Sequence, residues 1–520
     1  MKRESVISQL TDKDEPFDFV VIGGGATGLG VAVDAATRGY SVALFEQNDF
    51  TKGTSSRSTK LVHGGVRYLA QGDVSLVLEA LRERGLLRKN APHLVKDQKF
   101  LIPCYRWWEG PFYAIGLILY DLMAGKLGLG RSICIGPKRA LKTVPRLVPK
   151  GMTAGIIYHD GQFDDSRLAM HLVRSAIDAG GCVLNYMKVT SLVKEKGKIV
   201  GVVVCDRETD ISYTIKARCV INATGVFADD ILQMDEPGKR RTVRPSQGVH
   251  LVLDSSFLES DCAVMIPKTS DGRVLFAVPW HNKVVVGTTD TLMDHADEEP
   301  VALEKEIDFI LETAGKYLTK PPKRSDVLSV FAGLRPLAAP RSEGTKTKEI
   351  SRSHKLIREK SGLITIIGGK WTTYRKMAQD TLDYAIRYMH VPTHDCVTET
   401  FSIHGSKPDP DFSDPLYVYG SDAEEIKQII QSSPEMSEQL HPDYHYTVGE
   451  VVWIIRNEMP RSVEDILARR FRILFMDARA AIAMAPRVAV ILAKEWGKDE
   501  NWQSMQVKNF NQIASNYILN

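Results

Sequence analysis

The feature that most constrains the fold is a glycine-rich turn between two apolar segments near the start of the chain. Residues 18–22 form an apolar, β-branched run that predicts a buried strand. Gly23, Gly25 and Gly28 follow it in a G-x-G-x-x-G spacing. A helical stretch and a second apolar strand then complete a βαβ unit by Phe45. In this arrangement the first glycine allows a tight turn, the second admits a pyrophosphate, and the third lets helix and strand pack closely.

The residues around this turn suit a bound dinucleotide. Its phosphates would lie at the positive end of the helix, where Ala26 and Thr27 stand. Glu46 ends the second strand and can accept hydrogen bonds from ribose hydroxyls. A glycine triplet alone would also fit an ordinary turn, but the strand, turn, helix, strand and acid in this order make that interpretation improbable. The motif does not choose between NAD and FAD.

Two later segments favour FAD. Residues 220–225 form an apolar strand that ends in small residues, including Ala223 and Gly225. This stretch resembles the second FAD-contacting segment of flavoproteins with two dinucleotide-binding motifs. Residues 364–369 form another strand with a glycine turn, which in those enzymes passes close to the flavin. Either segment alone could be an ordinary strand end, but together with the glycine-rich turn they indicate a flavoprotein.

Composition bounds the remaining possibilities. The chain has 520 residues, of which 43% are hydrophobic and 25% charged, so two or three ordinary globular domains are expected. A net charge of +3 is too small to indicate nucleic-acid binding. The seven cysteines are scattered without a CxxC pair, which predicts neither a disulfide framework nor a zinc site, and no other metal site is expected. Residues 1–17 lack an apolar segment, so we expect a cytoplasmic protein without a secretory signal.

The predicted architecture is α/β. It comprises a Rossmann-type FAD-binding domain of the two-dinucleotide-binding, glutathione-reductase-like kind, an antiparallel-sheet substrate domain and a C-terminal α-helical domain. The first two are expected to interleave over residues 1–390. We assign FAD binding mainly to 16–95, 151–240 and 353–390, and substrate binding mainly to 96–150 and 241–352. A segment rich in Pro, Asp and Ser precedes a mostly helical pattern, which predicts the third domain over 391–520.

A longer stretch carries a specific resemblance. Residues 53–69, which read GTSSRSTKLVHGGVRYL, resemble the segment after the second strand in FAD-dependent glycerol-3-phosphate dehydrogenases of the aerobic, quinone-linked type. Similar motifs recur in the same order through residues 332–337 and 368–375. The resemblance implies oxidation of sn-glycerol 3-phosphate to dihydroxyacetone phosphate by hydride transfer to FAD, with electrons passed to a membrane quinone. It is also compatible with a homodimer.

This resemblance, together with the chemistry required, assigns the site residues. The reaction needs cations for the phosphate, a proton acceptor and a cation near the flavin. The predicted catalytic residues are His63, His250, Arg335 and Lys370. The predicted substrate-binding residues are Arg67, Tyr68, His250, Arg335, Arg352 and Lys370. The predicted FAD-binding residues are Gly23, Gly25, Ala26, Thr27, Gly28, Glu46, Thr54, Ser55, Ser56, Lys60, His63, Gly64, Val189, Ala223, Gly225, Gly369, Lys370 and Thr372.

Some alternatives stay open at this point. Which histidine accepts the proton cannot be read from the sequence, and Arg57, where relatives often have a small residue, fits either a phosphate contact or a solvated position. A 2-hydroxyacid or amine oxidase of the same architecture would also use arginines, to bind a carboxylate. A third hypothesis is a redox-inactive scaffold that binds a prenylated partner. The intact glycines, Glu46 and the Thr54–Ser56 cluster favour retained FAD.

One surface feature predicts contact with an anionic membrane. The apolar run 111–124 is too short to span a bilayer, and Trp107 and Trp108 precede it. Between residues 126 and 150 lie seven basic residues and no acidic one, namely Lys126, Arg131, Lys138, Arg139, Lys142, Arg146 and Lys150. This composition is typical of an interfacial anchor, here expected at the cytoplasmic face of the cell membrane. The alternative is a buried core helix beside a solvated basic face.

Overall fold

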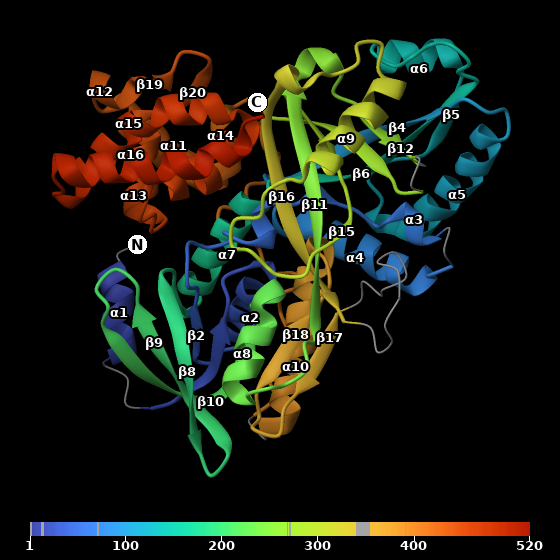
Figure 1. The fold of residues 1–520 in the computed structure, drawn as a ribbon. Helices are drawn as coiled ribbons and strands as arrows, with labels where there is room; N and C mark the ends of the chain where they lie inside the picture. Colours follow the sequence, from blue (N-terminus) through green and yellow to red (C-terminus); the bar gives the residue numbers. More distant parts are fainter. Residues whose placement is uncertain are drawn as a thin grey trace.

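The computed structural model describes residues 3–11, 15–69, 72–267, 269, 272–339, 354–389 and 392–519. The side chains of Arg67 and Tyr68 also lie outside the described part. Two sheets and a group of C-terminal helices make up the molecule, and they occupy separate parts of it (Figure 1). This arrangement confirms the predicted fold class.

The first sheet is the dinucleotide-binding sheet. Its central order is β17-β18-β10-β1-β2-β7, and β8 and β9 extend β10 as an antiparallel meander. The pairs joining β18, β10, β1, β2 and β7 are all parallel, as expected where helices connect the strands. The strands are β1 (Phe17–Ile22), β2 (Val42–Phe45), β7 (Cys182–Leu184), β8 (Met187–Glu195), β9 (Lys198–Asp206), β10 (Ser212–Asn222), β17 (Lys355–Arg358) and β18 (Ile364–Ile367).

The second sheet is larger and mostly antiparallel. Its order is β15-β11-β14-β13-β12-β4-β6-β3, with β16 paired to β11 and β5 paired to β6. Among the described strand pairs of this second sheet, only β12 and β4 run parallel. The strands are β3 (Leu61–Val62), β4 (Val95–Cys104), β5 (Ile133–Ile135), β6 (Ala154–Phe163), β11 (Val243–Asp254), β12 (Ala263–Ile266), β13 (Leu275–Trp280), β14 (Lys283–Gly287), β15 (Thr291–Leu292) and β16 (Val327–Ala338). Thus β6, although in a segment assigned mainly to FAD binding, belongs to this sheet.

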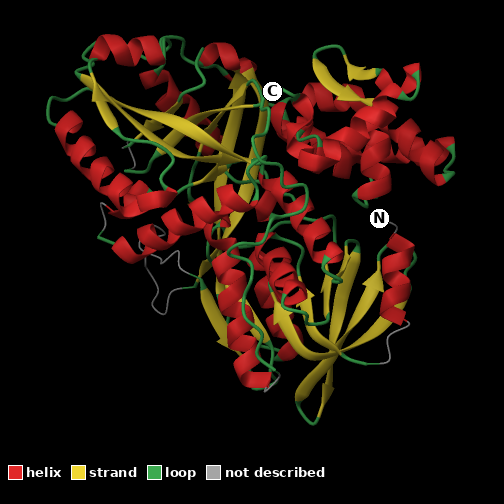
Figure 2. Ribbon diagram, turned by 180° about the vertical axis from the view of Figure 1, so that it is seen from behind, coloured by secondary structure: helices red, strands yellow, loops and turns green. Residues whose placement is uncertain are grey.

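Helices cover both sheets, as Figure 2 shows from behind. Those before residue 400 are α1 (Arg3–Thr11), α2 (Ala26–Thr37), α3 (Val66–Leu69), α4 (Val74–Asn90), α5 (Glu109–Ala124), α6 (Pro137–Thr143), α7 (Asp165–Asp178), α8 (Ala228–Asp235), α9 (Glu304–Tyr317) and α10 (Tyr374–Met389). Asp164 caps α7 by accepting hydrogen bonds from the backbone N–H groups of Ser166 and Arg167.

The C-terminal domain is helical as predicted, with one small hairpin that the sequence did not reveal. Its helices are α11 (Ala423–Gln431), α12 (Pro434–Ser437), α13 (Val448–Asn457), α14 (Ile473–Met476), α15 (Ala478–Trp496) and α16 (Glu500–Ala514), and its hairpin is β19 (Gln439–His441) with β20 (Tyr444–Thr447). One continuous apolar core joins α2, α7 and α10 to α13 and α15. The C-terminal domain therefore packs directly on the dinucleotide-binding part.

Candidate active site

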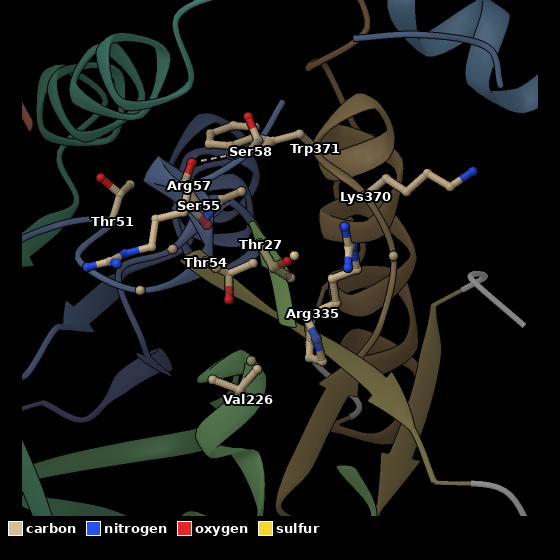
Figure 3. A pocket seen from close by; sticks show the side chains of 18 of the residues that line it. Thr27, Thr51, Thr54, Ser55, Arg57, Ser58, Val226, Arg335, Lys370 and Trp371 are labelled. Carbon is tan, nitrogen blue, oxygen red and sulfur yellow. Dashed lines mark hydrogen bonds between the residues drawn. The ribbon is translucent and has the colours of Figure 1, made fainter. Parts of the chain in front are cut away.

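A cavity of about 990 Å³ lies where the two sheets meet. Its lining includes the carboxyl ends of β1, β2 and β10 from the first sheet and side chains of β11 and β16 from the second. Ligands of open α/β sheets bind outside the carboxyl ends of the strands, so the cavity stands where the sequence predicts a dinucleotide. In Figure 3, Thr51, Thr54 and Ser55 lie on one side of the cavity, and Arg335 and Lys370 lie on the other.

The glycine-rich turn forms one end of the cavity. Gly23, Gly25, Ala26 and Thr27 line it at the N-terminus of α2. Gly28 does not line it, because it packs against the turn, and a Cβ there would collide with the carbonyl oxygen of Gly23. That contact explains the third glycine of the motif as a packing requirement between helix and strand.

Glu46 lines the cavity beside this turn, and its carboxylate is already oriented by two backbone groups. Oε2 accepts a hydrogen bond from Gly24 N at 2.7 Å and Oε1 accepts one from Asn48 N at 2.9 Å. Burial raises the pKa of the carboxyl, while these two hydrogen bonds act in the opposite direction. An ionised carboxylate retains further lone pairs that can accept hydrogen bonds from ribose hydroxyls.

The Thr54–Ser56 loop closes the same end, and contacts with distant segments fix its shape. Ser55 Oγ accepts a hydrogen bond from Ala26 N at 2.9 Å, and Ser55 O accepts one from Trp371 Nε1 at 2.8 Å. Thr54 and Ser55 line the cavity. Ser56 is buried behind them and does not line it. Its carbonyl accepts a hydrogen bond from Arg472 Nη2 at 2.7 Å, so the C-terminal domain holds the loop from behind.

Lys60, which the sequence assigned to FAD, lies elsewhere in the structure. Its side chain is fully buried, and Nζ lies 2.7 Å from Asp165 Oδ2 and 2.8 Å from Ser56 O. Burial lowers the pKa of this amine to about 7, against the opposing effect of Asp165. Lys60 therefore supports the loop and does not line the cavity. The Ser/Thr-rich sequence around Lys60 does not indicate which side chains of residues 53–69 point into the cavity.

Arg57 lines the cavity but is not solvated, and contacts within the protein hold its guanidinium. Its guanidinium is buried, donating from Nη2 to Glu299 Oε1 at 2.7 Å and from Nη1 to Ala332 O at 3.0 Å. The carboxylate of Glu299 helps keep the arginine pKa above its ordinary value despite burial. Arg57 thus joins the loop to β16 and to the segment before α9.

His250, on β11, also lines the cavity. Nε2 lies 2.9 Å from Thr59 Oγ1, and the ring stacks on Phe331 with centroids 4.9 Å apart. Among the described residues, Nδ1 has no hydrogen-bond partner. Burial lowers the pKa of His250 well below its ordinary value, and the positive charges of Lys60 and Arg335 add to this effect. The imidazole is therefore uncharged near neutral pH, the form that can accept a proton.

Arg335, on β16, stands opposite Ser246 of β11, and its guanidinium is near enough to His250 for its charge to lower the histidine pKa. Its Nη2 donates to Thr288 Oγ1 at 3.1 Å, and its Nη1 lies 3.6 Å from Asp290 Oδ1. Gly248 leaves room for the guanidinium, since a Cβ at that position would collide with Nη2. A glycine inside a strand is a sequence signal for such a close approach.

The other predicted residues are divided between the cavity and the rest of the chain. His63, Lys370, Val189, Ala223, Gly225, Gly369 and Thr372 line the cavity. Gly64 stands just behind its neighbour Gly65, which does line it. Arg352 and the side chains of Arg67 and Tyr68 lie outside the described residues. Thr288 and Asp290 also line the cavity, and the sequence analysis did not assign them to the site.

The described residues fit FAD. The cavity joins a phosphate-binding helix end, an oriented carboxylate and a distant cationic end, and Gly368 and Gly369 bring the backbone of the late turn to its wall. The model for the family "FAD dependent oxidoreductase" matches residues 18–375, and the "C-terminal domain of alpha-glycerophosphate oxidase" matches residues 363–503. Fold, site and these matches define the chain as an FAD-dependent oxidoreductase.

Comparison with individual proteins gives the family. The chain is 37% identical to the mitochondrial glycerol-3-phosphate dehydrogenase of Schizosaccharomyces pombe over 99% of its own length and 89% of that protein. It is 38% identical to the corresponding protein of Arabidopsis thaliana, over 97% and 87% of the two chains. The solved glycerol-3-phosphate dehydrogenase of Bacillus halodurans, complexed with FAD, superposes with a TM-score of 0.81 at 29% identity, covering 99% and 97% of the chains. The chain belongs to the glycerol-3-phosphate dehydrogenase family, and its cofactor is FAD.

Proposed function

We propose that the protein oxidises sn-glycerol 3-phosphate to dihydroxyacetone phosphate, with bound FAD accepting the hydride from the alcohol carbon. The observation that carries the proposal is that His250, whose pKa is lowered by burial, and the cationic Arg335 line the same cavity as the glycine-rich turn. An alcohol that carries a phosphate needs both a proton acceptor and a cation.

We assign the proton of the substrate hydroxyl to His250, because burial keeps its imidazole uncharged. His63 lines the same cavity and is the second candidate. We assign the substrate phosphate to Arg335, with Arg67 and Arg352 as further cations and Tyr68 as a hydroxyl donor. Lys370, beside the late glycine turn, supplies positive charge for the reduced flavin.

A substrate panel tests this function against the oxidase alternatives. The purified protein is assayed with a soluble quinone analogue and with sn-glycerol 3-phosphate, glycerol, glycolate and glycine. We expect turnover with sn-glycerol 3-phosphate to exceed that with the other three by at least two orders of magnitude. Faster turnover of glycolate or glycine would replace the proposal with a carboxylate-recognising oxidase.

We further propose that the protein docks on an anionic membrane surface through α5 and passes its electrons to a quinone there. Helix α5 supports this proposal because its outer face is apolar and exposed: Ile115 is 71% and Leu122 is 73% exposed. The exposed apolar side chains on and before the helix are Trp107, Trp108, Phe112, Ile115, Ile118, Leu119 and Leu122. Contiguous apolar patches of this kind are rare on proteins that contact only water. The alternative of a fully buried core helix is therefore disfavoured.

Exposed basic side chains follow this helix along the chain. Lys126 follows α5, and Lys138, Arg139 and Lys142 on α6 are exposed. Each basic side chain near an anionic leaflet adds roughly 1 kcal/mol of attraction. Within the described residues, no helix combines the length and apolarity needed to cross a bilayer. We propose peripheral attachment at the cytoplasmic face of the cell membrane; the relatives from Schizosaccharomyces pombe and Arabidopsis thaliana are named as mitochondrial proteins.

Flotation with liposomes tests the docking surface. We expect bound protein to rise with the anionic lipid fraction and to fall when Lys138, Arg139 and Lys142 are replaced by Glu. Replacing Ile115 and Leu122 by Ser should reduce binding at every lipid composition. Replacement of the exposed Lys196, Lys198 and Lys216 by Glu is the matched control and should leave binding unchanged, because these residues belong to the β8–β10 meander, which lies far from α5 and α6 in Figure 1. Binding that ignores both α5 and α6 would refute this docking surface.

A further inference from the structure

A buried polar network lies beneath the turn that brings His63 to the cavity. Tyr120 is the polar side chain on the inner face of α5, and it is 1% exposed. Its hydroxyl lies 2.8 Å from Asp160 Oδ2 on β6 and 2.8 Å from Gly64 N. Arg84 on α4 completes the network by donating from Nη1 to Asp160 Oδ1 at 2.7 Å. Three separate elements thus converge on one backbone amide.

The direction of each hydrogen bond follows from the chemistry of the groups. Burial and the neighbouring Asp160 carboxylate raise the pKa of Tyr120 well above its ordinary value, so the phenol keeps its proton. A carboxylate only accepts hydrogen bonds, and therefore the phenol donates to Asp160. The phenol oxygen then accepts the shorter hydrogen bond from Gly64 N, at 2.8 Å, and Asp160 Oδ1 accepts a longer one from the same amide at 3.4 Å. Arg84, whose pKa is also raised, holds the opposite oxygen of the carboxylate.

The fit around Gly64 leaves little freedom to the turn. A Cβ on Gly64 would lie 2.5 Å from the Tyr120 hydroxyl, so the backbone rests directly on the phenol. The next residue, Gly65, has a φ of +76° and lines the cavity. On the other side, His63 N donates to Thr372 Oγ1 at 3.2 Å. The His63–Gly65 turn is therefore held on one side by Thr372, which follows the late glycine turn, and on the other side by Tyr120.

We propose that Tyr120 is a positioning residue for the reaction: through Asp160 and Gly64 it fixes the His63–Gly65 turn against the bound flavin and substrate. This inference rests on the proposed function for its kinetic consequence, but its structural consequence is independent of the substrate. Helix α5 thereby has two roles. Its exposed face carries apolar side chains, and its buried face carries the Tyr120 hydroxyl that contacts the turn. Figure 1 shows α3, α4 and α5 packed together beside the second sheet.

The test is Tyr120→Phe, which keeps the ring and removes only the hydroxyl. We expect kcat for sn-glycerol 3-phosphate to fall at least tenfold while KM changes less than threefold, with flavin content close to wild type and Tm lowered, because a buried donor and a buried acceptor lose their partner. Hydrogen–deuterium exchange of the Gly64 amide should accelerate at least tenfold. Tyr419→Phe is the matched control, because Tyr419 is equally buried and donates to a carboxylate, Glu450 Oε1, in the C-terminal domain. It should lower Tm without changing kcat.

The outcomes separate this inference from the proposed function. An unchanged kcat together with unchanged Gly64 exchange would overturn the role of Tyr120, as would a loss of kcat that only parallels loss of flavin. If wild-type protein does not oxidise sn-glycerol 3-phosphate, the proposed function fails, and Gly64 exchange alone then decides whether Tyr120 holds the turn. Should Tyr120→Phe fail to fold, Arg84→Lys loosens Asp160 while keeping the phenol. It should lower kcat in the same direction, and an unchanged kcat in that variant would refute the network.

Discussion

The two ends of the cavity are built by different means. At the phosphate-binding end, Gly23 and the small residues 25–27 form the wall, together with Thr54 and Ser55. At the substrate end, side chains from distant segments converge: His250 from β11, Arg335 from β16 and Lys370 after β18. The first end depends on local backbone geometry, and the second depends on the register of long-range strand pairs. The two ends should therefore fail differently when they are altered.

The largest effect is expected at the phosphate-binding end. Gly25→Asp places a carboxylate at the N-terminus of α2, where we expect the pyrophosphate of FAD, and the nearby Ser55 Oγ leaves little space for the side chain. We expect complete loss of the cofactor, measured as flavin absorbance per protein after purification. Gly136→Asp is the control, because Gly136 is the N-cap of α6 and has open space around it. Normal flavin content in Gly25→Asp would show that the turn does not bind FAD.

A smaller and more selective effect is expected at the substrate end. Arg335→Ala removes a charged hydrogen-bond donor, which should cost about 2 kcal/mol of transition-state stabilisation or more, roughly 30-fold in kcat/KM. Flavin content should stay normal, and any oxidation of glycerol should change little, because glycerol has no phosphate. Arg324→Ala, at a half-buried arginine that pairs with Glu304, should leave both substrates unaffected. Equal losses with both substrates would assign Arg335 a structural role.

The smallest effect concerns the pH dependence at the same end. Because its pKa is lowered, His250 becomes protonated only at a lower pH than an ordinary histidine. We therefore expect kcat at saturating substrate to keep its neutral value down to pH about 6.5, the ordinary histidine pKa, and to decline only below it. Parallel profiles of His63→Asn and His250→Asn identify the base, because only the substitution of the base should abolish this decline. A decline centred above pH 6.5 would contradict the buried, uncharged imidazole.

The same comparison explains how far the sequence predicted the site. The glycine spacing and Glu46 specify a local chain path, so the phosphate-binding end could be placed from a single contiguous motif. The parallel first sheet was predictable from apolar strands that alternate with helical stretches. The C-terminal domain was predictable from its helical pattern, because both patterns are local in the sequence. His250 and Arg335 were identified through family resemblance, and the register of β11 with β16 then brings their strands together.

Other features needed the structure because they depend on contacts between distant segments. The sequence could not show that Lys60 turns away from the cavity toward Asp165, or that Arg57 pairs with Glu299. Thr288 and Asp290 became site residues only through their contacts with Arg335. Likewise the apolar run around α5 gave no sign that Tyr120 reaches Gly64. Each of these residues is of a common type, and its role becomes clear only from the residue that it contacts.

Anaerobic titration of the purified protein with sn-glycerol 3-phosphate tests the central claim most directly. The absorbance of oxidised flavin is followed as substrate is added, and product is assayed at the end. We predict that the flavin absorbance is lost on addition of sn-glycerol 3-phosphate and that dihydroxyacetone phosphate appears in equal amount to the flavin reduced. Glycerol at the same concentration should leave the spectrum unchanged. An oxidised flavin spectrum that persists in excess sn-glycerol 3-phosphate would contradict the proposed function.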